Sequence, residues 1–339
     1  MRKAIGISVL AAALTCSAAA LADPTITEFD APGAHTTNVA GIGNGGDITG
    51  VYVLANGGDG GYVRKSDGSF VFFDQPTALP QAVNAKGETA GSMQDASDDA
   101  FFAGADGTVS AFRPPDWGRF FAVADAIDGK GNVAGSYYDT HLISRGFLRS
   151  RGGHIVSFDA PGAGTKSEKG TFVTGLASGG IAAGYVVDNS NADHGFVRAK
   201  DGSFTTIDIA GATTKGTHVV CISANGTVGG YYWKSRGIAH AFLRDLAGNI
   251  AVFNARNADS TVVQSVNSKG FAVGYWVPAE GAPHGFVRTP IGHIVTFDAP
   301  GAGTAPGQGT FPTGINDKGE IAGYYTDSAD IQHGFFRTK

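Results

Sequence analysis

The sequence predicts an all-β fold, a seven-bladed β-propeller with four antiparallel strands in each blade, and two observations carry this prediction. A unit of about 45 residues recurs seven times along the chain, and each unit holds four short β-rich segments between glycine-containing turns. The last unit lacks its fourth strand, whereas the chain carries a spare strand near its start. A ring in which the N-terminal strand completes the last blade accounts for both observations.

Three features recur in a fixed order within each unit. The first is an apolar segment that closes on a glycine, and this glycine is found at Gly50, Gly91, Gly135, Gly184, Gly230, Gly274 and Gly323. The second is a small residue followed by an aromatic one, with the aromatics at Tyr62, Phe101, Phe147, Phe196, Phe242, Phe286 and Phe335. The third is an apolar residue that is usually followed by aspartate, as in Phe158-Asp159 and Phe297-Asp298.

Residues 170–208 illustrate how one unit divides into four strands. We expect the strands at residues 170–176, 181–187, 194–199 and 203–209. Asp201-Gly202 separates the last two segments and is a favoured hairpin turn. No segment has a sustained helical period of apolar residues, so the unit is a four-stranded blade.

The two ends of the chain are complementary. The last unit ends at residues 333–337 without a fourth strand, and residues 25–30 form a strand that belongs to no unit. We therefore expect these two segments to pair and to close the circle. Closure would also remove an open sheet edge, and such unpaired edges favour aggregation.

The first 22 residues have the features of an export signal. Arg2 and Lys3 precede an apolar stretch at residues 4–14, and Ala20-Leu21-Ala22 places small residues at the two positions that signal peptidase reads. The prediction is a signal peptide at residues 1–22 and a single domain at residues 23–339, secreted to the periplasm or beyond. Lipid attachment at Cys16 is the alternative, although the residues before it fit that motif poorly.

Composition excludes several classes of function. The net charge is −5 and the chain has no basic stretch, so nucleic acid is not an expected partner. No second apolar stretch approaches the length of a membrane span, and Cys221 is the single cysteine of the mature chain. No cofactor motif is present, and we expect a monomer.

Elements of the unit resemble a known family. His-Gly-Phe, Gly-Ile-Asn-x-x-Gly-x-x-x-Gly and Phe-Asp-Ala-Pro-Gly-Ala are similar to the bacterial extracellular repeats called the HAF family, most fully in residues 153–199 and 292–338. The resemblance covers essentially the whole mature chain, but the second unit departs from it at Ala100-Phe101 and Phe112-Arg113-Pro114. The resemblance implies a secreted protein and implies no particular activity or catalytic residue.

Residues that recur in many units are interpreted as structural. We expect the recurring histidines to bond the aspartate of a Phe-Asp pair rather than a metal, because successive copies lie on different blades; these are His194, His240, His284 and His333. We expect the recurring arginines to cover aromatic faces or to pair with carboxylates. These are Arg149, Arg198, Arg244, Arg288 and Arg337.

Function is expected on the face that carries the long, variable connections, namely the loops between second and third strands and the links between blades. Residues there that do not repeat form the candidate ligand-binding set: Trp117, Arg119, Phe120, Tyr138, Trp233, Lys234, Arg236 and Trp276. Aromatic rings interspersed with charged groups suit sugars, which stack on rings and need polar partners for their hydroxyls. The alternative is that the tyrosines pack between blades with their hydroxyls toward water.

Three classes of function remain open from the sequence. The leading hypothesis is a non-catalytic binding module for a carbohydrate or for a cell-surface or protein partner. The second is a polysaccharide-degrading lyase or hydrolase on the same face, with candidate residues Asp116, Tyr138, His141 and Arg145. The third is a structural component of the envelope or matrix. Fold alone does not choose among them.

Overall fold

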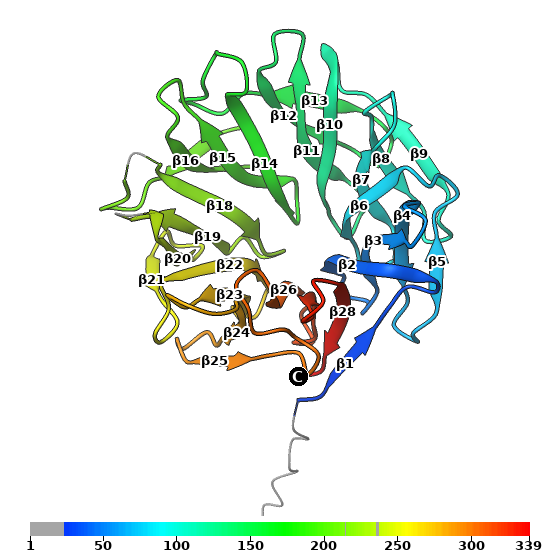
Figure 1. Cartoon of the computed structure of the whole chain (residues 1–339). Helices are drawn as coiled ribbons and strands as arrows, with labels where there is room; N and C mark the ends of the chain where they lie inside the picture. The colour runs from blue at the N-terminus through cyan, green and yellow to red at the C-terminus, as the bar shows by residue number, and fades with distance from the viewer. Residues whose placement is uncertain (1–23, 214, 235–236) are drawn as a thin grey trace, which may run out of the picture.

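The structure, a computed structural model, describes residues 24–213, 215–234 and 237–339, and the predicted signal peptide lies outside these ranges. The elements of the described chain are β-strands, which form five four-stranded sheets and one eight-stranded sheet. Figure 1 shows the sheets side by side around a common centre. The all-β fold predicted from the sequence is confirmed. Within these ranges, no helix is long and apolar enough to cross a membrane.

The strands of the first half of the chain follow the order expected from the repeat. The strand β1 (Ile26–Phe29) precedes a sheet of β2 (Ala34–Ile42), β3 (Ile48–Leu54), β4 (Asp59–Arg64) and β5 (Phe70–Phe72). The next sheet contains β6 (Ala78–Val83), β7 (Thr89–Met93), β8 (Ala100–Ala103) and β9 (Val109–Phe112). Both sheets are antiparallel meanders in which each strand pairs with the one before it.

The eight-stranded sheet consists of two such meanders. The first contains β10 (Trp117–Ile127), β11 (Val133–Asp139), β12 (Ser144–Arg149) and β13 (Ile155–Phe158). The second contains β14 (Gly170–Ala177), β15 (Ile181–Val187), β16 (Asp193–Arg198) and β17 (Phe204–Ile207), whose bounds agree with the prediction to within two residues. A single parallel bridge between Ser144 and Gly170 joins the two.

The remaining strands form three more four-stranded sheets. One contains β18 (Thr217–Ile222), β19 (Val228–Trp233), β20 (Ala239–Arg244) and β21 (Ile250–Phe253), and the next contains β22 (Ser260–Val266), β23 (Ala272–Val277), β24 (His284–Arg288) and β25 (Ile294–Phe297). The last contains β26 (Gly309–Ile315), β27 (Ile321–Thr326), β28 (Gln332–Arg337) and β1. The expected pairing of the two chain ends is thus present, with Ile26 opposite Arg337 and Phe29 opposite Gly334.

Aromatic and aliphatic side chains fill the space between neighbouring sheets. The aromatic residue of the second recurring feature is at most 2% exposed in every unit. The apolar cluster around this ring contains residues of two neighbouring sheets. For example, Phe147 of β12 packs with Ala90 of β7 and Ala100 of β8. Each such ring removes apolar surface worth roughly 2–3 kcal/mol. The recurring phenylalanines therefore act as the apolar contact between sheets, as the sequence indicated.

Polar contacts repeat with the same spacing. His194 lies 2.8 Å from Asp208, His284 lies 2.9 Å from Asp298, and His240 is hydrogen bonded to Asn254. Arginine guanidinium groups lie 4.6–4.9 Å above phenylalanine rings of the preceding sheet, in the pairs Arg64–Phe29, Arg149–Phe112, Arg198–Phe158, Arg288–Phe253 and Arg337–Phe297. The predicted bond from histidine to aspartate is confirmed for His194 and His284, whereas His240 bonds an asparagine instead. The predicted place over an aromatic face is confirmed for Arg149, Arg198, Arg288 and Arg337.

Steric crowding explains why glycine closes the first recurring feature. It lies on the second strand of each meander, opposite a β-bulge in the first strand, as Gly184 lies opposite the bulge after Val173. A Cβ at Gly184 would overlap the carbonyl oxygen of Phe172, and the equivalent glycines meet backbone oxygens in the same way. Only glycine permits this close approach of two backbones.

Candidate functional site

The first strand of each meander lies nearest the centre in Figure 1, and its bulge places one extra residue there. We call β2, β6, β10, β14, β18, β22 and β26 the inner strands. Their bulge residues are Ala40, Gln81, Asp125, Thr174, Val220, Gln264 and Thr313. Asp125 is the one residue of this set that can carry a charge, so β10 differs from the other inner strands at the same structural position.

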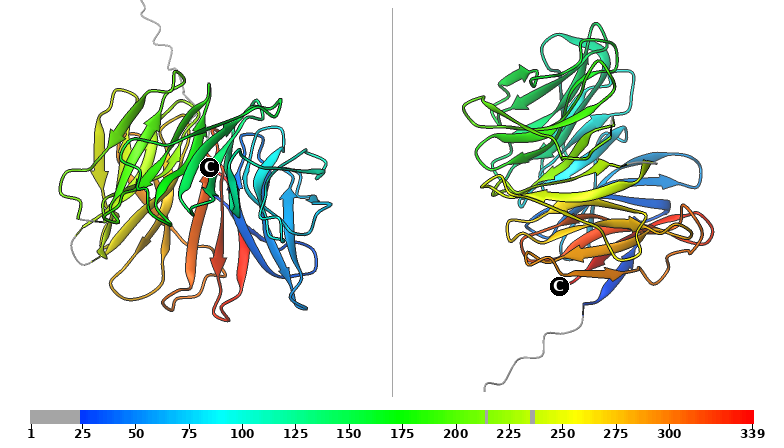
Figure 2. Two further views of the ribbon diagram at one scale, coloured as in Figure 1. Left: turned by 90° about the horizontal axis from the view of Figure 1, so that it is seen from above. Right: turned by 90° about the vertical axis from the view of Figure 1, so that its left-hand side faces the viewer.

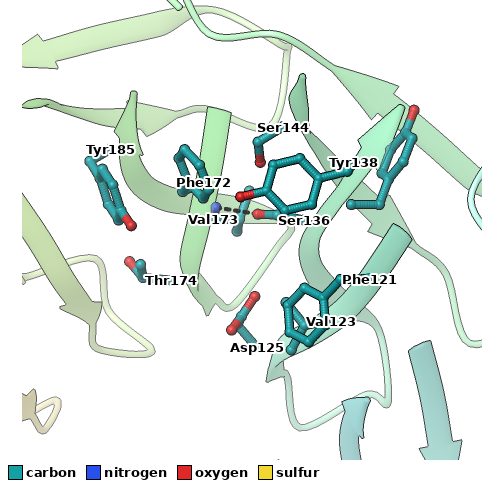
Figure 3. A pocket seen from close by; sticks show the side chains of 11 residues that line it. Phe121, Val123, Asp125, Ser136, Tyr138, Ser144, Phe172, Val173, Thr174 and Tyr185 are labelled. Carbon is teal, nitrogen blue, oxygen red and sulfur yellow. Dashed lines mark hydrogen bonds between the residues drawn. The ribbon is translucent and has the colours of Figure 1, made fainter. Parts of the chain in front are cut away.

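A cavity of 230 Å³ lies between the meander that begins with β10 and the one that begins with β14. Figure 3 shows its lining, in which Asp125 lies between Phe121 and Val123 on one side and Thr174 and Tyr185 on the other. The complete lining consists of Phe121, Val123, Asp125, Ser136, Tyr137, Tyr138, Ser144, Phe172, Val173, Thr174 and Tyr185. We call this space the aromatic cavity, because rings from four strands contribute to it.

One small residue contributes to the volume of the aromatic cavity. Residues that follow the strand-two glycine are tyrosines in the four later meanders, namely Tyr185, Tyr231, Tyr275 and Tyr324. The three earlier meanders carry smaller residues there, namely Val51, Ser92 and Ser136. Tyr185 fills its position fully, because its ring is stacked between Phe172, 5.1 Å away, and His218, 3.8 Å away. The small Ser136 side chain lines the cavity, and its hydroxyl accepts a hydrogen bond of 2.7 Å from the backbone N–H of Val173 (Figure 3).

The carboxyl group of Asp125 lies in an environment of low polarity. Burial raises its pKa to about 8, and the opposing contribution comes only from the backbone N–H of Asp125 itself. Among the described residues, no side chain forms a hydrogen bond or an ion pair with Asp125, and none of the residues lining the cavity is basic. The group is therefore a largely protonated acid at neutral pH that faces an open space.

Two exposed phenylalanines stand where β10 begins. Phe120 is 50% exposed and Phe121 is 47% exposed, although both belong to a strand. The pairing of β10 with β11 is irregular on both sides of Phe120, and Phe121 has a φ of 32°, which is unfavourable for a bulky residue. Strain of this kind persists only where the surroundings impose it and is common at binding sites. Phe121 is part of the lining of the aromatic cavity, and the exposed Phe120 precedes it in the strand.

A continuous series of rings extends from the cavity toward the next sheets. Tyr138 contacts Phe172 edge-on with ring centres 6.5 Å apart, and Phe172 stacks on Tyr185. His218 continues the series between Tyr185 and Tyr231, which meets Trp233 edge-on at 5.4 Å. Such ring pairs stabilise a packed arrangement by about 0.5–1.5 kcal/mol each. The tyrosines thus pack between sheets, as the alternative interpretation expected, and Tyr138 and Tyr185 also face the cavity.

The candidate residues proposed from the sequence do not gather in one place. Tyr138 lines the cavity, and Phe120 pairs with it across the β10–β11 ladder. Trp233 lies at the other end of the ring series with the Lys215 ammonium 4.9 Å above it, followed by the exposed Lys234. Trp117 lies under Arg113 and Trp276 stacks on His284, both partly buried against apolar clusters. Arg236 and the side chain of Arg119 lie outside the described residues.

The candidate residues for catalysis are also separated. Of the four, only Tyr138 lines the aromatic cavity. Arg145 is engaged by Asp139 at 3.1 Å and by Asp159 at 3.5 Å, and His141 is exposed. The sequence reasoning missed Asp125 and Ser136. Asp125 carried a signal, because it is the single charged residue within the segment 120–127. Ser136 carried none, because Ser92 occupies the same position in the preceding unit.

Comparison with known proteins supports the fold class. No family model matches the chain, and no curated protein sequence matches it. Among solved structures, a prolyl endopeptidase has a TM-score of 0.60 at 15% identity, over 89% of this chain and 48% of the peptidase. The BP39L lectin from Burkholderia pseudomallei has a TM-score of 0.52 at 11% identity, over 90% of this chain and 100% of the lectin.

TolB from Acinetobacter baumannii is a third structural neighbour, with a TM-score of 0.50 at 11% identity over 74% of this chain and 62% of TolB. The chain thus spans about half of the peptidase and about three fifths of TolB. These neighbours are propeller proteins, and the class of protein defined here is an all-β protein with a propeller-like fold. At these identities the likeness concerns the fold alone.

Proposed function

We propose that the chain is a secreted, seven-bladed propeller of the HAF-repeat type, closed by β1, that binds a carbohydrate without transforming it. The ligand enters the aromatic cavity from the long-loop face. The observation that carries the proposal is the cavity itself, which combines rings from two neighbouring meanders with one unpaired carboxyl group. Pockets that are mostly apolar with a few convergent polar groups are typical ligand sites.

Contacts between the first and last sheets support a closed ring. The guanidinium group of Arg64 on β4 lies 4.8 Å above the ring of Phe29 on β1. At the opposite end of the inner strands, the side-chain amide of Asn316 donates to the carbonyl oxygen of Gly43 at 3.3 Å. A second cavity at that end is lined by one aliphatic residue from each inner strand: Ile42, Val83, Ile127, Leu176, Ile222, Val266 and Ile315.

The chemistry of the aromatic cavity supports a sugar as the ligand. The C–H face of a pyranose stacks on an aromatic ring, and its hydroxyls need donors and acceptors. Phe121 and Tyr138 supply rings near the entrance, and Asp125 and the Tyr138 hydroxyl supply polar groups. Because the structural neighbours include a lectin and peptidases, the fold itself does not choose the function, and the proposal depends on this site.

The test is a binding panel with matched variants. A ligand that binds only the folded protein raises its melting midpoint by mass action. We expect one class of oligosaccharide to raise the midpoint, and we expect Phe121→Ala to abolish the shift. Phe72→Ala is the matched control, because Phe72 is also exposed but lies on β5 outside the cavity. A panel without any shift would contradict carbohydrate binding and favour a protein partner or a structural role.

A polysaccharide-degrading enzyme is the second candidate, and the pKa of Asp125 is the observation that favours it. A carboxyl group with a pKa near 8 is protonated at neutral pH and suits a general acid. Glycoside hydrolysis ordinarily needs two carboxylates, and Asp125 is the only one among the residues that line the cavity. New reducing ends released from the bound oligosaccharide, and lost in Asp125→Asn, would establish this function.

A further inference from the structure

We propose that the group entering the aromatic cavity is an organic ammonium ion, held between the aromatic rings with Asp125 as its counter-charge. The inference deepens the proposed function and rests on it, because it names the part of the ligand that the cavity recognises. Two sources share this chemistry: an amino sugar with a free amine, and a choline-type head group. Each is a compact cation carried on a larger polar molecule.

The unpaired state of Asp125 is the first argument. Several carboxylates of the described chain have a cationic or histidine partner: Asp99 with Arg113, Asp139 and Asp159 with Arg145, Glu88 with Arg151, and Asp193 with His218. Asp125 has none in the same described ranges, although burial of a charge without a partner is costly. A cationic ligand would supply the partner that Asp125 lacks among the described residues.

The rings around Asp125 are the second argument. Phe121, Tyr138, Phe172 and Tyr185 come from four different strands and border one space. The face of an aromatic ring is electrostatically negative, so several rings around one space attract an ammonium group, most strongly when water is excluded. Arginine is placed over phenylalanine repeatedly elsewhere in this fold, as at Arg198 and Phe158. The aromatic cavity offers the rings of Phe121 and Tyr138 with no basic residue in its lining, whereas the faces of Tyr185 are covered by Phe172 and His218.

The volume of the aromatic cavity limits how much of the ligand can enter it. The volume of 230 Å³ is below the range of about 300–1,000 Å³ found for pockets that enclose drug-sized ligands. A single head group or one substituted sugar ring therefore occupies the cavity. The rest of the molecule would lie against the exposed rings of Phe120 and Phe121 at the entrance.

The proton on Asp125 makes the binding of a cation dependent on pH. Tyr138 and Tyr185 face it, and burial raises the pKa of both phenols away from neutrality. The pair of His218 and Asp193 lies behind Tyr185. Asp125 must lose its proton to pair with a cation, so affinity for an ammonium ion should fall roughly tenfold for each pH unit below 8.

The experiment compares three probes on the purified full chain by titration calorimetry. Choline tests the ammonium group alone, an oligomer of glucosamine tests the amine on a sugar, and the same oligomer of N-acetylglucosamine is the control that lacks the charge. We expect choline or the glucosamine oligomer to bind, with close to one proton released per choline at pH 7. Asp125→Asn should lower the affinity for both cations at least tenfold. Gln264→Ala changes the bulge residue of β22 and should leave both affinities unchanged.

Each outcome separates the inference from the proposed function. Equal binding of both oligomers, or binding of the acetylated one alone, would overturn the ammonium inference and leave carbohydrate binding intact. Binding of choline alone would support the inference and contradict a sugar ligand. Binding of none of the probes would overturn the inference. The number of protons released is measured on the unmodified protein, so the result does not depend on whether a variant folds.

Discussion

Replacement of Asp125 by asparagine tests the electrostatic description of the cavity without any ligand. Asparagine keeps the shape of the side chain and cannot ionise. Burial raises the pKa of Asp125 from 3.8 to about 8 in the folded protein, whereas the unfolded chain keeps an ordinary value. Between these two values the folded protein holds a proton that the unfolded chain has lost. The free energy of unfolding of the native protein therefore falls as pH rises through this window, and the variant lacks that contribution.

The magnitude follows from the size of the shift. About four pH units at about 1.4 kcal/mol each give an upper limit of about 6 kcal/mol above pH 8. The side chain is partly exposed to the cavity, and water there reduces the cost of the charge. We therefore expect Asp125→Asn to be close to neutral near pH 4 and to stabilise the protein by about 2–5 kcal/mol at pH 9 relative to the native chain.

Urea unfolding at pH 5, 7 and 9, followed by aromatic fluorescence, measures this difference for the two proteins side by side. Other titrating groups contribute equally to both proteins, so the difference isolates Asp125. A difference that does not change with pH would refute the reasoning, and it would indicate that Asp125 keeps an ordinary pKa. A difference of the opposite sign would indicate an unrecognised cationic partner.

Three further predictions concern the repeated framework. Gly184→Ala should destabilise the protein by more than about 3 kcal/mol, because the added Cβ overlaps the carbonyl oxygen of Phe172; an unchanged melting curve would contradict the bulge geometry. Thr310→Val should cost about 1–3 kcal/mol in urea unfolding, because its buried hydroxyl accepts the N–H of Ala299; no loss would mean that the N–H finds another acceptor. Deletion of residues 24–30 removes β1 and should leave β28 with an open edge, giving lower unfolding temperature and concentration-dependent aggregation; a stable monomer would contradict the closure by β1.

Local pattern explains how much of the fold was predictable. The four strands within residues 170–208 followed from β-rich alternation and from the Asp201-Gly202 turn, and the structure has them within two residues. The pairing of β1 with β28 followed from counting strands, although the residues concerned are separated by almost the whole chain. The bulges did not follow from the pattern, because a single extra residue leaves the alternation on either side intact.

The site was predictable only in part, because its residues come from different units. Tyr138 was identified from its place near the long loops, and it lines the cavity. The cavity needs Phe172 and Tyr185 from the next meander as well, and sequence reasoning does not show how deeply two sheets approach each other. Asp125 was overlooked because it lies inside an apolar strand, and neither its position at a bulge nor its place in the cavity lining can be recognised in the sequence.

Departures from the repeat are more informative about function here than the repeat itself. At the bulge position six inner strands carry uncharged residues and β10 carries Asp125. At the position after the strand-two glycine, the four later meanders carry a tyrosine, whereas β3, β7 and β11 carry Val51, Ser92 and Ser136. Asp125 and Ser136 occur in one meander and border one space, which also contains the strained Phe121. An acid without a partner and a strained backbone each weaken a framework, so their coincidence at a cavity is expected of a binding site and not of a further copy of the structural unit.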